Sequence, residues 1–593
     1  MTRRSLAPDL TGGDLAPVAK PAVATPAESA ARPARRFVTL DPSTVIWVGA
    51  TLLLVFMIVA PMARLLFSSF QSTETGQLTL ENYVTAYGNL RRLVGLGNSL
   101  LYGAAVVLVA TGFAVPLAWA VARTDMPAKG LVRATVLGAF ITPSYLGAIG
   151  WILLAGPNAG WLNRLWMALT GAHAGIVNVY SFAGLVLVTA LYAFPYIFVF
   201  TADALDRVSS EMEEAAHILG LSPFRTILRV TLPLVLPAIL GGAIIVFLDT
   251  VALFGTPAVI ALPARVNIMT LQLWQFFEFP VRAEAAAAYA VPLVLITIAM
   301  LALQRTILGR KGYVSLTGKG GGRSLMRLGR LRWAVLGFCF TVCALAVFLP
   351  YLALAQAAFS RAWGQGFSFA NLTLGNFAYL FGEASSRQVI LNTFIFSAAT
   401  ACLAVVLALI VAYVVGRRLV IGGGVLAGLC MAPLVVPGIV LAIGLYAVYS
   451  APPLMLYGTA AILVLGFTTR FLPIAFANCT ASLRSLNPEM EEAVRILGGS
   501  RFVAVRRVVV PLLKKSLIGT WLLVFIPASR ELSTAIFLVA AKTRVISVMI
   551  LDLSENGSFE TLAALGFFLL GVTILIVLAG YRLVGRDFLL RKS

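Results

Sequence analysis

Two segments of the chain carry the same pattern of acidic, small and basic residues. Residues 211–215 read Glu-Met-Glu-Glu-Ala, and residues 489–493 repeat those five residues unchanged. Each copy continues to a glycine, Gly220 or Gly498, and then through a basic stretch to a proline. The chain offers no visible nucleophile–base pair or metal cluster, so the chemistry that this pattern indicates is recognition of a partner rather than catalysis.

Each copy is expected to form a short helix, a glycine turn and a second short helix. Acidic residues in the first turn complement the helix macrodipole, and the glycine suits a left-handed helix end. One copy alone is also compatible with an amphipathic helix lying on the membrane surface, whereas two copies favour a partner with two-fold symmetry. We predict a docking loop in each copy, formed by Glu213, Glu214, Ala215, Gly220, Glu491, Glu492, Ala493 and Gly498.

A second group of candidate residues is charged and lies in apolar sequence. Asp249 and Glu531, with Arg530 beside it, are expected beyond the middle of the bilayer, on the side away from the two motif copies. A buried charge there is costly and must face a cavity or a partner. Two interpretations stay open: a polar patch on a translocation path, or a structural ion pair or helix cap that holds two parts of the chain together.

The other reactive residues do not form a site pattern. The five cysteines lie in or beside apolar stretches without a paired-cysteine motif, and there are two histidines. Neither a metal site nor a set of catalytic residues is therefore expected. The phosphate-binding loop G-x-x-x-x-G-K-[ST] is absent, so we expect no ATP or other cofactor to bind to this chain itself.

Composition places the chain among membrane proteins. Of its 593 residues, 60% are apolar and 12% are charged, against about 45–50% and 25% in soluble domains. The apolar runs are continuous over ~20 residues, which is typical of membrane helices rather than of barrel strands. The net charge is +21, and the basic residues cluster between the apolar runs. This distribution is the one that the positive-inside rule expects of a membrane protein, and it argues against nucleic acid as a partner.

Twelve apolar runs, in two sets of six, must position the candidate residues. The predicted domains are a disordered tail at 1–42, a first repeat at 43–308, a basic linker at 309–331 and a second repeat at 332–593. The runs are expected at about 44–68, 98–122, 133–155, 177–203, 234–256 and 285–308, and at about 332–357, 390–416, 423–450, 457–480, 512–538 and 561–584.

The bias of Lys and Arg sets the orientation. The tail, the linker and the C-terminal end are basic, and an even number of spans separates each from the next, so all three are expected in the cytoplasm. Both motif copies then also lie in the cytoplasm. Arg91 and Arg92 are exceptions that fall outside. The outer loop at about 257–284 is expected to cover the pore, to contact a binding protein or to lie in an aromatic belt.

The two sets form an internal repeat. Residues 78–83 resemble residues 372–377, and Asn98-Ser99 resembles Asn392-Thr393. Since six spans is an even number, both halves have the same orientation, with a pseudo-two-fold axis along the membrane normal. The predicted fold is an all-α polytopic membrane protein of about 12 transmembrane helices in two parallel six-helix repeats.

The duplicated motif resembles the EAA signature of permease subunits of ATP-binding-cassette importers. That resemblance covers roughly residues 44–590 and implies a type I importer-like fold in the bacterial inner membrane. It implies that both loops dock on a cytoplasmic ATPase homodimer, which binds the ATP, and that a periplasmic substrate-binding protein delivers the substrate. A secondary transporter is the alternative class, but it would need charged coupling sites within its spans and no docking loops.

The fused layout most resembles permeases for ferric iron, so the resemblance implies ferric iron as the substrate. Residues 248–250 with 254–257, and residues 530–533, add to this similarity. Fused permeases for thiamine, and related permeases for polyamines or phosphonates, are similar, so these substrates stay open as alternatives.

Overall fold

The computed structural model describes residues 42–72, 75–208, 210–309, 325–366, 368–420 and 422–584. Nearly all of the predicted tail, most of the predicted linker and residues 585–593 lie outside these ranges. Within them the chain is built from helices, with three isolated β-bridges and no strand. The all-α prediction is therefore confirmed for the part of the chain that the structure describes.

The first half contains α1 (Pro42–Leu54), η1 (Val55–Val59), α2 (Ala60–Ser69), α3 (Glu81–Tyr87), α4 (Leu90–Arg123), α5 (Lys129–Ile141), α6 (Ser144–Ala155), α7 (Trp161–Thr170), α8 (Phe182–Arg207), α9 (Ser210–Ile218), α10 (Pro223–Thr226), η2 (Ile227–Thr231), α11 (Leu232–Ala252), α12 (Gly255–Ile260), α13 (Met269–Gln275) and α14 (Ala283–Gly309).

The second half contains α15 (Leu331–Cys343), η3 (Ala344–Phe348), α16 (Leu349–Ala358), η4 (Trp363–Gln365), η5 (Phe369–Asn371), α17 (Gly375–Gly382), α18 (Ala384–Gly416), α19 (Gly423–Met431), η6 (Ala432–Leu434), α20 (Gly438–Tyr449), α21 (Ala460–Arg484), α22 (Glu489–Ile496), α23 (Arg501–Ala504), η7 (Val505–Val509), α24 (Val510–Ala528), α25 (Ala535–Leu538), η8 (Ala541–Thr543), α26 (Ile546–Glu555) and α27 (Phe559–Val584).

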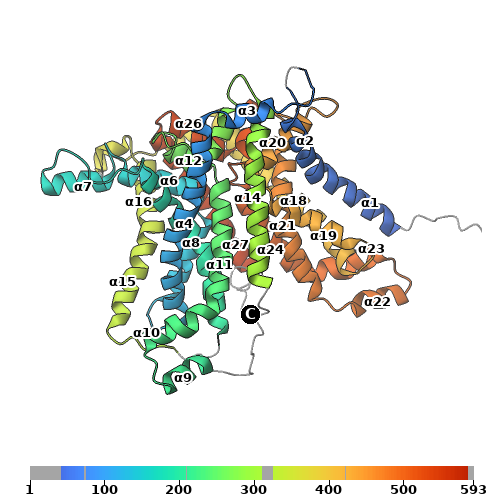
Figure 1. Cartoon of the computed structure of the whole chain (residues 1–593), viewed down its shortest axis with the longest axis horizontal. Coiled ribbons are helices and arrows are strands. Elements are labelled where there is room, and N and C mark those ends of the chain that lie inside the picture. The colour runs from blue at the N-terminus through green and yellow to red at the C-terminus, as the bar shows by residue number, and fades with distance from the viewer. Residues whose placement is uncertain are drawn as a thin grey trace, which may run out of the picture.

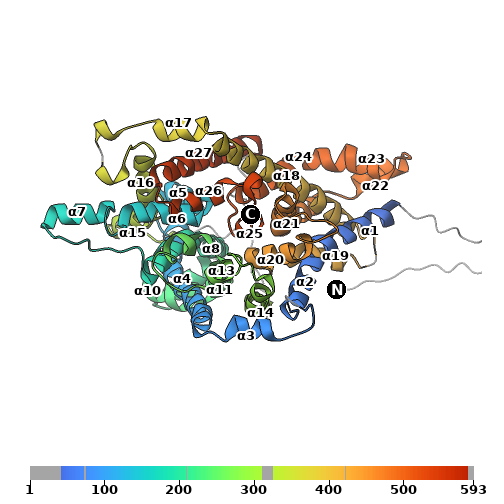
Figure 2. The same ribbon diagram turned by 90° about the horizontal axis from the view of Figure 1, so that it is seen from above.

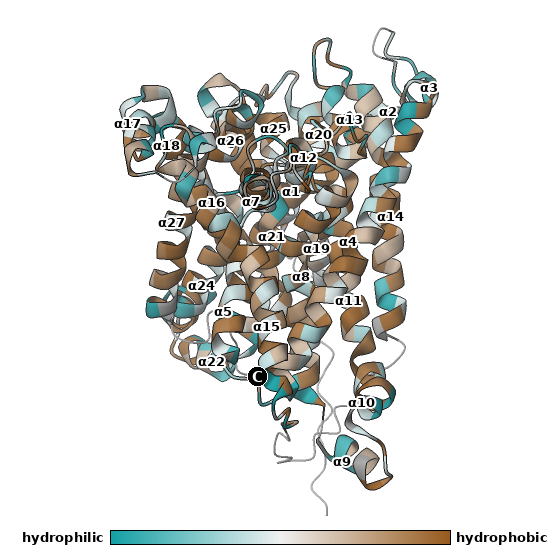
Figure 3. Cartoon of the chain, turned by 90° about the vertical axis from the view of Figure 1, so that its left-hand side faces the viewer, coloured by the Kyte–Doolittle hydropathy of each residue, from teal (hydrophilic) through white to brown (hydrophobic). Residues whose placement is uncertain are grey.

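Among the described residues, ten helical segments are long and apolar enough to cross a membrane, and two bent pairs raise the number to as many as twelve. Figure 3 shows apolar residues along the length of these helices and polar residues gathered toward the two ends of the molecule. We call the side that carries α9 and α22 the motif side. The side that carries α3, α13 and α26 is the opposite side (Figure 1).

The third run of each half is not the continuous span that we predicted. Residues 129–155 bend by 103° between α5 and α6, and residues 423–449 bend by 110° between η6 and α20. Pro143 and Pro437 stand directly before the second helix of each pair. Proline removes a backbone donor and drives the preceding residue toward extended conformations, which favours a break in the helix at each of these positions.

The fifth run of each half also ends earlier than predicted. The expected span at 512–538 stops at Ala528, where α24 ends, and the chain then turns before α25. Arg530 and Glu531 consequently lie in this turn rather than inside a membrane helix. In the first half α11 ends at Ala252, which leaves Asp249 in its last turn.

Equivalent asparagines confirm the internal repeat at the level of hydrogen bonds. The Asn82 side-chain amide donates to the Ser69 and Gln71 carbonyls, at 3.2 and 2.8 Å, just beyond the end of α2. The Asn376 amide donates to the Ala358 and Ser360 carbonyls, at 3.0 and 2.9 Å, at the end of α16. Each half therefore fastens the end of its first long helix in the same way.

A second pair of contacts repeats where α13 and α26 begin. The Ser99 hydroxyl accepts a hydrogen bond from the Met269 backbone N–H at 2.8 Å. In the second half the Thr393 hydroxyl accepts from the Ile546 N–H, also at 2.8 Å. The Asn-Ser and Asn-Thr pairs found in the sequence thus anchor equivalent short helices on the opposite side.

The two halves exchange their first helices. The segment α1–α2 of the first half lies beside α19 and α20 of the second half, and α15–α16 lies beside α5 and α6 of the first (Figure 2). A β-carbon at Gly444 would lie 2.8 Å from the Pro61 carbonyl oxygen, and one at Gly150 would lie 2.7 Å from the Pro350 β-carbon. Each bent pair therefore receives a proline of the other half against a glycine.

We expect Gly150→Ala and Gly444→Ala to destabilise the protein, because each added methyl group overlaps atoms of the other half. Overpacking of this kind costs about 1–3 kcal/mol, which should appear as a lower thermal unfolding temperature in detergent. Gly112→Ala in α4 is the control, since its β-carbon would meet no atom within 4 Å. Equal unfolding temperatures for all three variants would contradict the assigned packing.

Candidate functional site

The two motif copies form loops on the same side of the molecule. In the first, α9 is followed by a turn and α10, and in the second α22 is followed by a turn and α23. Figures 1 and 2 agree that the two loops lie apart, one beneath each half. We refer to residues 210–231 and 489–509 as the first and second motif loops.

Glycine ends the first helix of each motif loop, as the sequence predicted. Gly220 has φ +81° and Gly498 has φ +83°, both in the left-handed region. The backbone N–H of the residue after each glycine donates to a carbonyl five positions earlier: Leu221 to Ala216 at 3.0 Å, and Gly499 to Val494 at 2.9 Å. These bonds are those of a Schellman helix end, which needs a residue that tolerates positive φ.

Four of the predicted docking residues are presented to solvent. Glu214 and Ala215 are exposed in the first loop, and Glu492 and Ala493 are exposed at the same positions of the second. Both glycines are exposed as well.

An exposed apolar pair that sequence reasoning missed precedes each glycine. Ile218 and Leu219 are 86% and 81% exposed, and Ile496 and Leu497 are 86% and 88% exposed. Exposed apolar residues of this kind, repeated at the same place in both halves, are typical of surfaces that bind another molecule. The repeated Ile-Leu before each glycine was visible in the sequence, but its exposure required the structure.

The carboxylate of Glu491 does not face solvent. It accepts hydrogen bonds from the Tyr413 hydroxyl at 2.8 Å and from the Arg417 guanidinium at 2.9 and 2.5 Å. Both side chains of this ion pair are largely buried, at 15% exposed for Arg417 and 10% for Glu491. Glu491 therefore fastens the second motif loop to the motif-side end of α18.

Glu213 occupies the equivalent position in the first motif loop. Its carboxylate accepts a hydrogen bond from the Thr231 hydroxyl at 2.8 Å and lies 3.8 Å from the Arg123 guanidinium, at the end of α4. Arg123 also donates to the Val208 carbonyl at 2.7 Å. In both halves the glutamate at the third position of the motif thus turns toward the second long helix, whereas the glutamate at the fourth position faces outward.

The end of the predicted linker contacts the same corner of the first half. The backbone N–H of Met326 donates to the Arg123 carbonyl at 2.9 Å, and the Asp125 N–H donates to the Met326 carbonyl at 3.1 Å. The Asp125 carboxylate accepts from the Leu328 N–H at 2.9 Å. The chain that leads into the second half is therefore fixed beside the helix end that carries Arg123.

Arg530 connects the two halves at the bend of the first one. Its guanidinium donates to the carbonyls of Ile141 and Phe140, the last residues of α5. Carbonyls at a helix end lack intrahelical partners and carry the negative end of the macrodipole. Arg530 therefore caps α5 from the other half, which is the kind of contact that the structural interpretation of this charge predicts.

Glu531 connects to the bend of the second half. Its carboxylate accepts from Arg470 Nε at 3.2 Å and from the Thr534 N–H at 2.9 Å. The Arg470 guanidinium packs against Gly438, the first residue after the bend. Sequence reasoning missed Arg470 because it lies singly in the apolar run of α21. Arg530 and Glu531, adjacent in the chain, thus hold the bent pairs of both halves.

Asp249 lies near this group without a direct bond to it. The Asp249 side chain is exposed although it lies deep among protein atoms, so it faces solvent-accessible space inside the protein. Arg470, Glu531 and Arg530 are close enough to act on it electrostatically. The geometry therefore leaves Asp249 available to a polar path. Among the described residues, no group of three or more His, Cys, Asp and Glu side chains is arranged to hold a metal ion.

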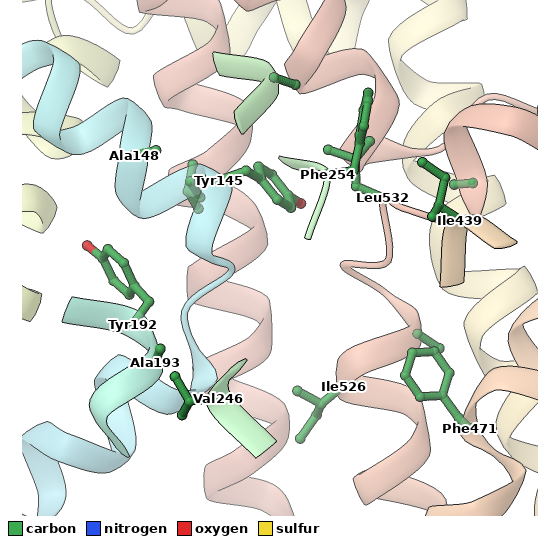
Figure 4. Packing of buried hydrophobic residues seen from close by; sticks show 14 of the residues in the cluster. Tyr145, Ala148, Tyr192, Ala193, Val246, Phe254, Ile439, Phe471, Ile526 and Leu532 are labelled. Carbon is green, nitrogen blue, oxygen red and sulfur yellow. The ribbon is translucent and has the colours of Figure 1, made fainter. Parts of the chain in front are cut away.

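Aromatic residues close the opposite side between the halves. The Phe537 ring packs edge-on against Phe254 and Phe277 of the first half, with ring centroids 6.2 and 4.9 Å apart. Phe277 also packs against Tyr446 at 5.2 Å. Figure 4 shows Tyr145, Phe254 and Leu532 close together at this level. Phe277 of the predicted outer loop therefore faces the other half rather than forming part of a lipid-facing belt.

The sequence matches the family described as "Binding-protein-dependent transport system inner membrane component" over residues 93–311 and 408–588. The chain belongs to this family. Each matched segment includes one motif loop and one whole bent pair, in agreement with the repeat seen in the structure. This membership supports an ABC transporter permease and removes the support for a secondary transporter.

Relatives of this permease include ferric transport proteins. A ferric transport system permease protein of Actinobacillus pleuropneumoniae is 27% identical over 89% of this chain and 76% of its own length. A putative ferric transport system permease protein of Haemophilus influenzae is 26% identical, over 83% and 77%. A probable molybdenum ABC transporter permease of Haloferax volcanii is 28% identical over 43% of this chain and 88% of its own length.

Solved structures of importers also align with the permease. A chain of a bacterial ABC transporter involved in the import of the acidic polysaccharide alginate aligns with a TM-score of 0.37 and 15% identity. That alignment covers 44% of this permease and 94% of the solved chain.

Proposed function

We propose that this permease forms the translocation path of an ABC importer and is driven by a cytoplasmic ATPase dimer that docks on its two motif loops. The observation that carries this proposal is the pair of equivalent exposed surfaces on one side of the molecule. Each presents a glutamate, an alanine and an apolar Ile-Leu pair before a left-handed glycine. Apolar residues with a charged neighbour are what a partner groove would cover.

The inward-facing glutamates have a different role in this proposal. Glu213 and Glu491 join each motif loop to the second long helix of its own half, so movement of a loop is passed to α4 or α18. Glu214 and Glu492 remain exposed for contact with the ATPase. ATP is bound and hydrolysed by the partner subunits, and the permease supplies no catalytic residue.

The arrangement of the two ends supports alternating access as the transport mechanism. The opposite side is closed by Phe277, Phe537 and Tyr446, while the motif loops lie apart. This combination supports a state open toward the motif side, and we propose that the motif side and both chain termini lie in the cytoplasm of a bacterium. Closure of the ATPase dimer would bring the loops together and open the aromatic contact, with Asp249 facing the path and Arg530, Glu531 and Arg470 holding its walls.

Ferric iron is the proposed substrate, supplied by a periplasmic substrate-binding protein. The support is that relatives named as ferric transport permeases align with both halves, whereas the molybdenum relative aligns with less than half of the chain. Thiamine, polyamine and phosphonate importers are the alternatives within the same class.

The test is reconstitution of the permease in lipid vesicles with candidate ATPase and substrate-binding proteins of the same organism. We expect the ATPase to co-purify and ATP hydrolysis to rise several-fold when the iron-loaded binding protein is added. Stimulation by a thiamine- or polyamine-loaded protein, but not by the iron-loaded one, would overturn the substrate. Failure of any ATPase to associate with the permease would overturn the function.

A further inference from the structure

Three arginines converge on a hollow at the opposite side of the first half. The hollow has a volume of about 280 Å³ and is formed where α4 begins and where the chain passes from α13 to α14. Its lining includes Arg91, Arg92 and Arg282, with Glu278 as the one carboxylate among the lining residues. We call it the arginine pocket.

Neither the membrane orientation of the chain nor the stability of α4 explains the positive charges of Arg91 and Arg92. Arg91 and Arg92 lie in the first turn of α4, where the positive end of the macrodipole disfavours cations. They also lie on the side where the positive-inside rule disfavours them. Because both the helix macrodipole and the positive-inside rule disfavour these arginines, their presence points to a role in binding an anion.

The guanidinium groups of the pocket are held by neutral partners. Arg91 Nε donates to the Asn267 side-chain oxygen at 3.0 Å, and the Arg92 guanidinium lies 4.7 Å from the centre of the Phe276 ring. Arg92 and Arg282 are close enough to repel one another. The positive charges are thus oriented but not neutralised.

No carboxylate in the described part of the chain forms an ion pair with any of the three arginines. Glu278 lines the pocket but lies close enough to Glu555 of the second half to raise the pKa of that carboxyl, after the larger effects of burial and of Asp552. The described part of the chain therefore leaves the three arginines of the pocket without an ion-pair partner.

The pocket belongs to one half only, which separates it from the path. All of its lining residues come from the first half, whereas the proposed translocation path lies between the halves. The repeat that aligns Asn98 with Asn392 places Ser385 and Ser386 where Arg91 and Arg92 would be. A transported substrate does not require a site that is present in only one half of the permease. A partner protein that docks across the pseudo-two-fold axis, however, must distinguish the first half of the permease from the second.

The rim of the pocket is suited to a protein partner. The Phe279 side chain is 97% exposed and lies beside the three arginines. Arginine together with an aromatic residue is the composition enriched at the core of protein interfaces. A free inorganic anion would gain nothing from the exposed ring.

We propose that the arginine pocket accepts a carboxylate side chain of the substrate-binding protein and thereby fixes the orientation in which that protein docks. This inference rests on the proposed function, because it requires a binding protein on the opposite side. It adds a site and a specificity: the first half binds a carboxylate of the partner, and the second half does not.

The test compares Arg91→Ser/Arg92→Ser, which copies the residues of the second half, with Arg387→Ser in α18 as the control. The affinity of the permease–ATPase complex in lipid nanodiscs is measured, at two salt concentrations, for the substrate-binding protein that stimulates its ATP hydrolysis. We expect the double variant to bind at least about tenfold more weakly, with a smaller salt dependence. The control should keep the wild-type affinity.

Further measurements keep the outcome decisive. Arg282→Ser alters an exposed side chain and should give a weaker loss of the same sign, even if the double variant proves unstable. Basal ATP hydrolysis should be unchanged in every variant. Unchanged affinity in both variants would overturn the proposal. The proposal would also be overturned if the pocket bound only a free anion. In that case inorganic phosphate would raise the unfolding temperature of the wild type but not of the variants, and all of them would bind the binding protein with equal affinity. A wild-type complex that binds no binding protein would instead count against the proposed function.

Discussion

Replacing Gly498 with valine is expected to abolish ATP-driven uptake while leaving the membrane-spanning core folded. Gly498 has φ +83°, and a β-carbon there would meet no atom within 4 Å. The penalty is thus conformational rather than steric, roughly 1–2 kcal/mol for a residue with a side chain and larger for a β-branched one. The second motif loop should rearrange, and the Ile496-Leu497 pair should lose its position.

The control is Gly498→Asn, because asparagine tolerates the left-handed region. Co-purification of the ATPase and uptake are measured for both variants and for the matching pair at Gly220. We expect valine to weaken association and stop uptake, and asparagine to retain most of both. If the two substitutions behave alike, or if the valine variants associate and transport normally, the docking role of the loops is wrong.

Neutralising Glu491 is expected to uncouple ATP hydrolysis from transport. The Glu491→Gln variant leaves Arg417 largely buried without its carboxylate, and breaking such a pair costs about 3–5 kcal/mol. We expect the second motif loop to detach from α18, so that the ATPase still binds and hydrolyses ATP but uptake per ATP falls more than tenfold. Uptake and ATP hydrolysis measured on the same vesicles give this ratio.

Glu492→Gln is the matched control, since its carboxylate is exposed one residue away. This variant should weaken ATPase association but leave the uptake per ATP unchanged once the subunit is bound. Glu491→Gln/Arg417→Met removes both charges and should recover part of the coupling. Identical effects of Glu491→Gln and Glu492→Gln would show that both carboxylates act in docking.

Repetition made the motif loops predictable from the sequence. Glu211–Ala215 recurs unchanged at Glu489–Ala493, and a glycine follows at the same distance in both copies, so the helix end at Gly220 and Gly498 followed from backbone chemistry. The direction of the side chains did not follow. Glu213 and Glu214 are neighbours of the same type, and only the position of α4 decides which of them is covered.

The polar interior was less predictable because it depends on distant contacts. Asp249, Arg530 and Glu531 could be identified from the sequence because they are charged residues in apolar runs. The continuous hydropathy of those runs, however, concealed the turn after Ala528 and the bends at Pro143 and Pro437. Arg470 contributes through a contact with Glu531, which lies in another helix. No local pattern in the sequence contains that pairing.

The exchange of first helices has a consequence for biosynthesis. The helix α2 completes its packing against α20, which the ribosome makes only after the whole first half and the linker. At about 5–20 residues per second, α2 waits for tens of seconds beside lipid, and Gly444 closes on Pro61 only when the second bend has entered the membrane. Packing of the first helices is therefore completed late in synthesis, and a transcript truncated after the linker would yield a first half whose α2 packs against α14 but lacks α20.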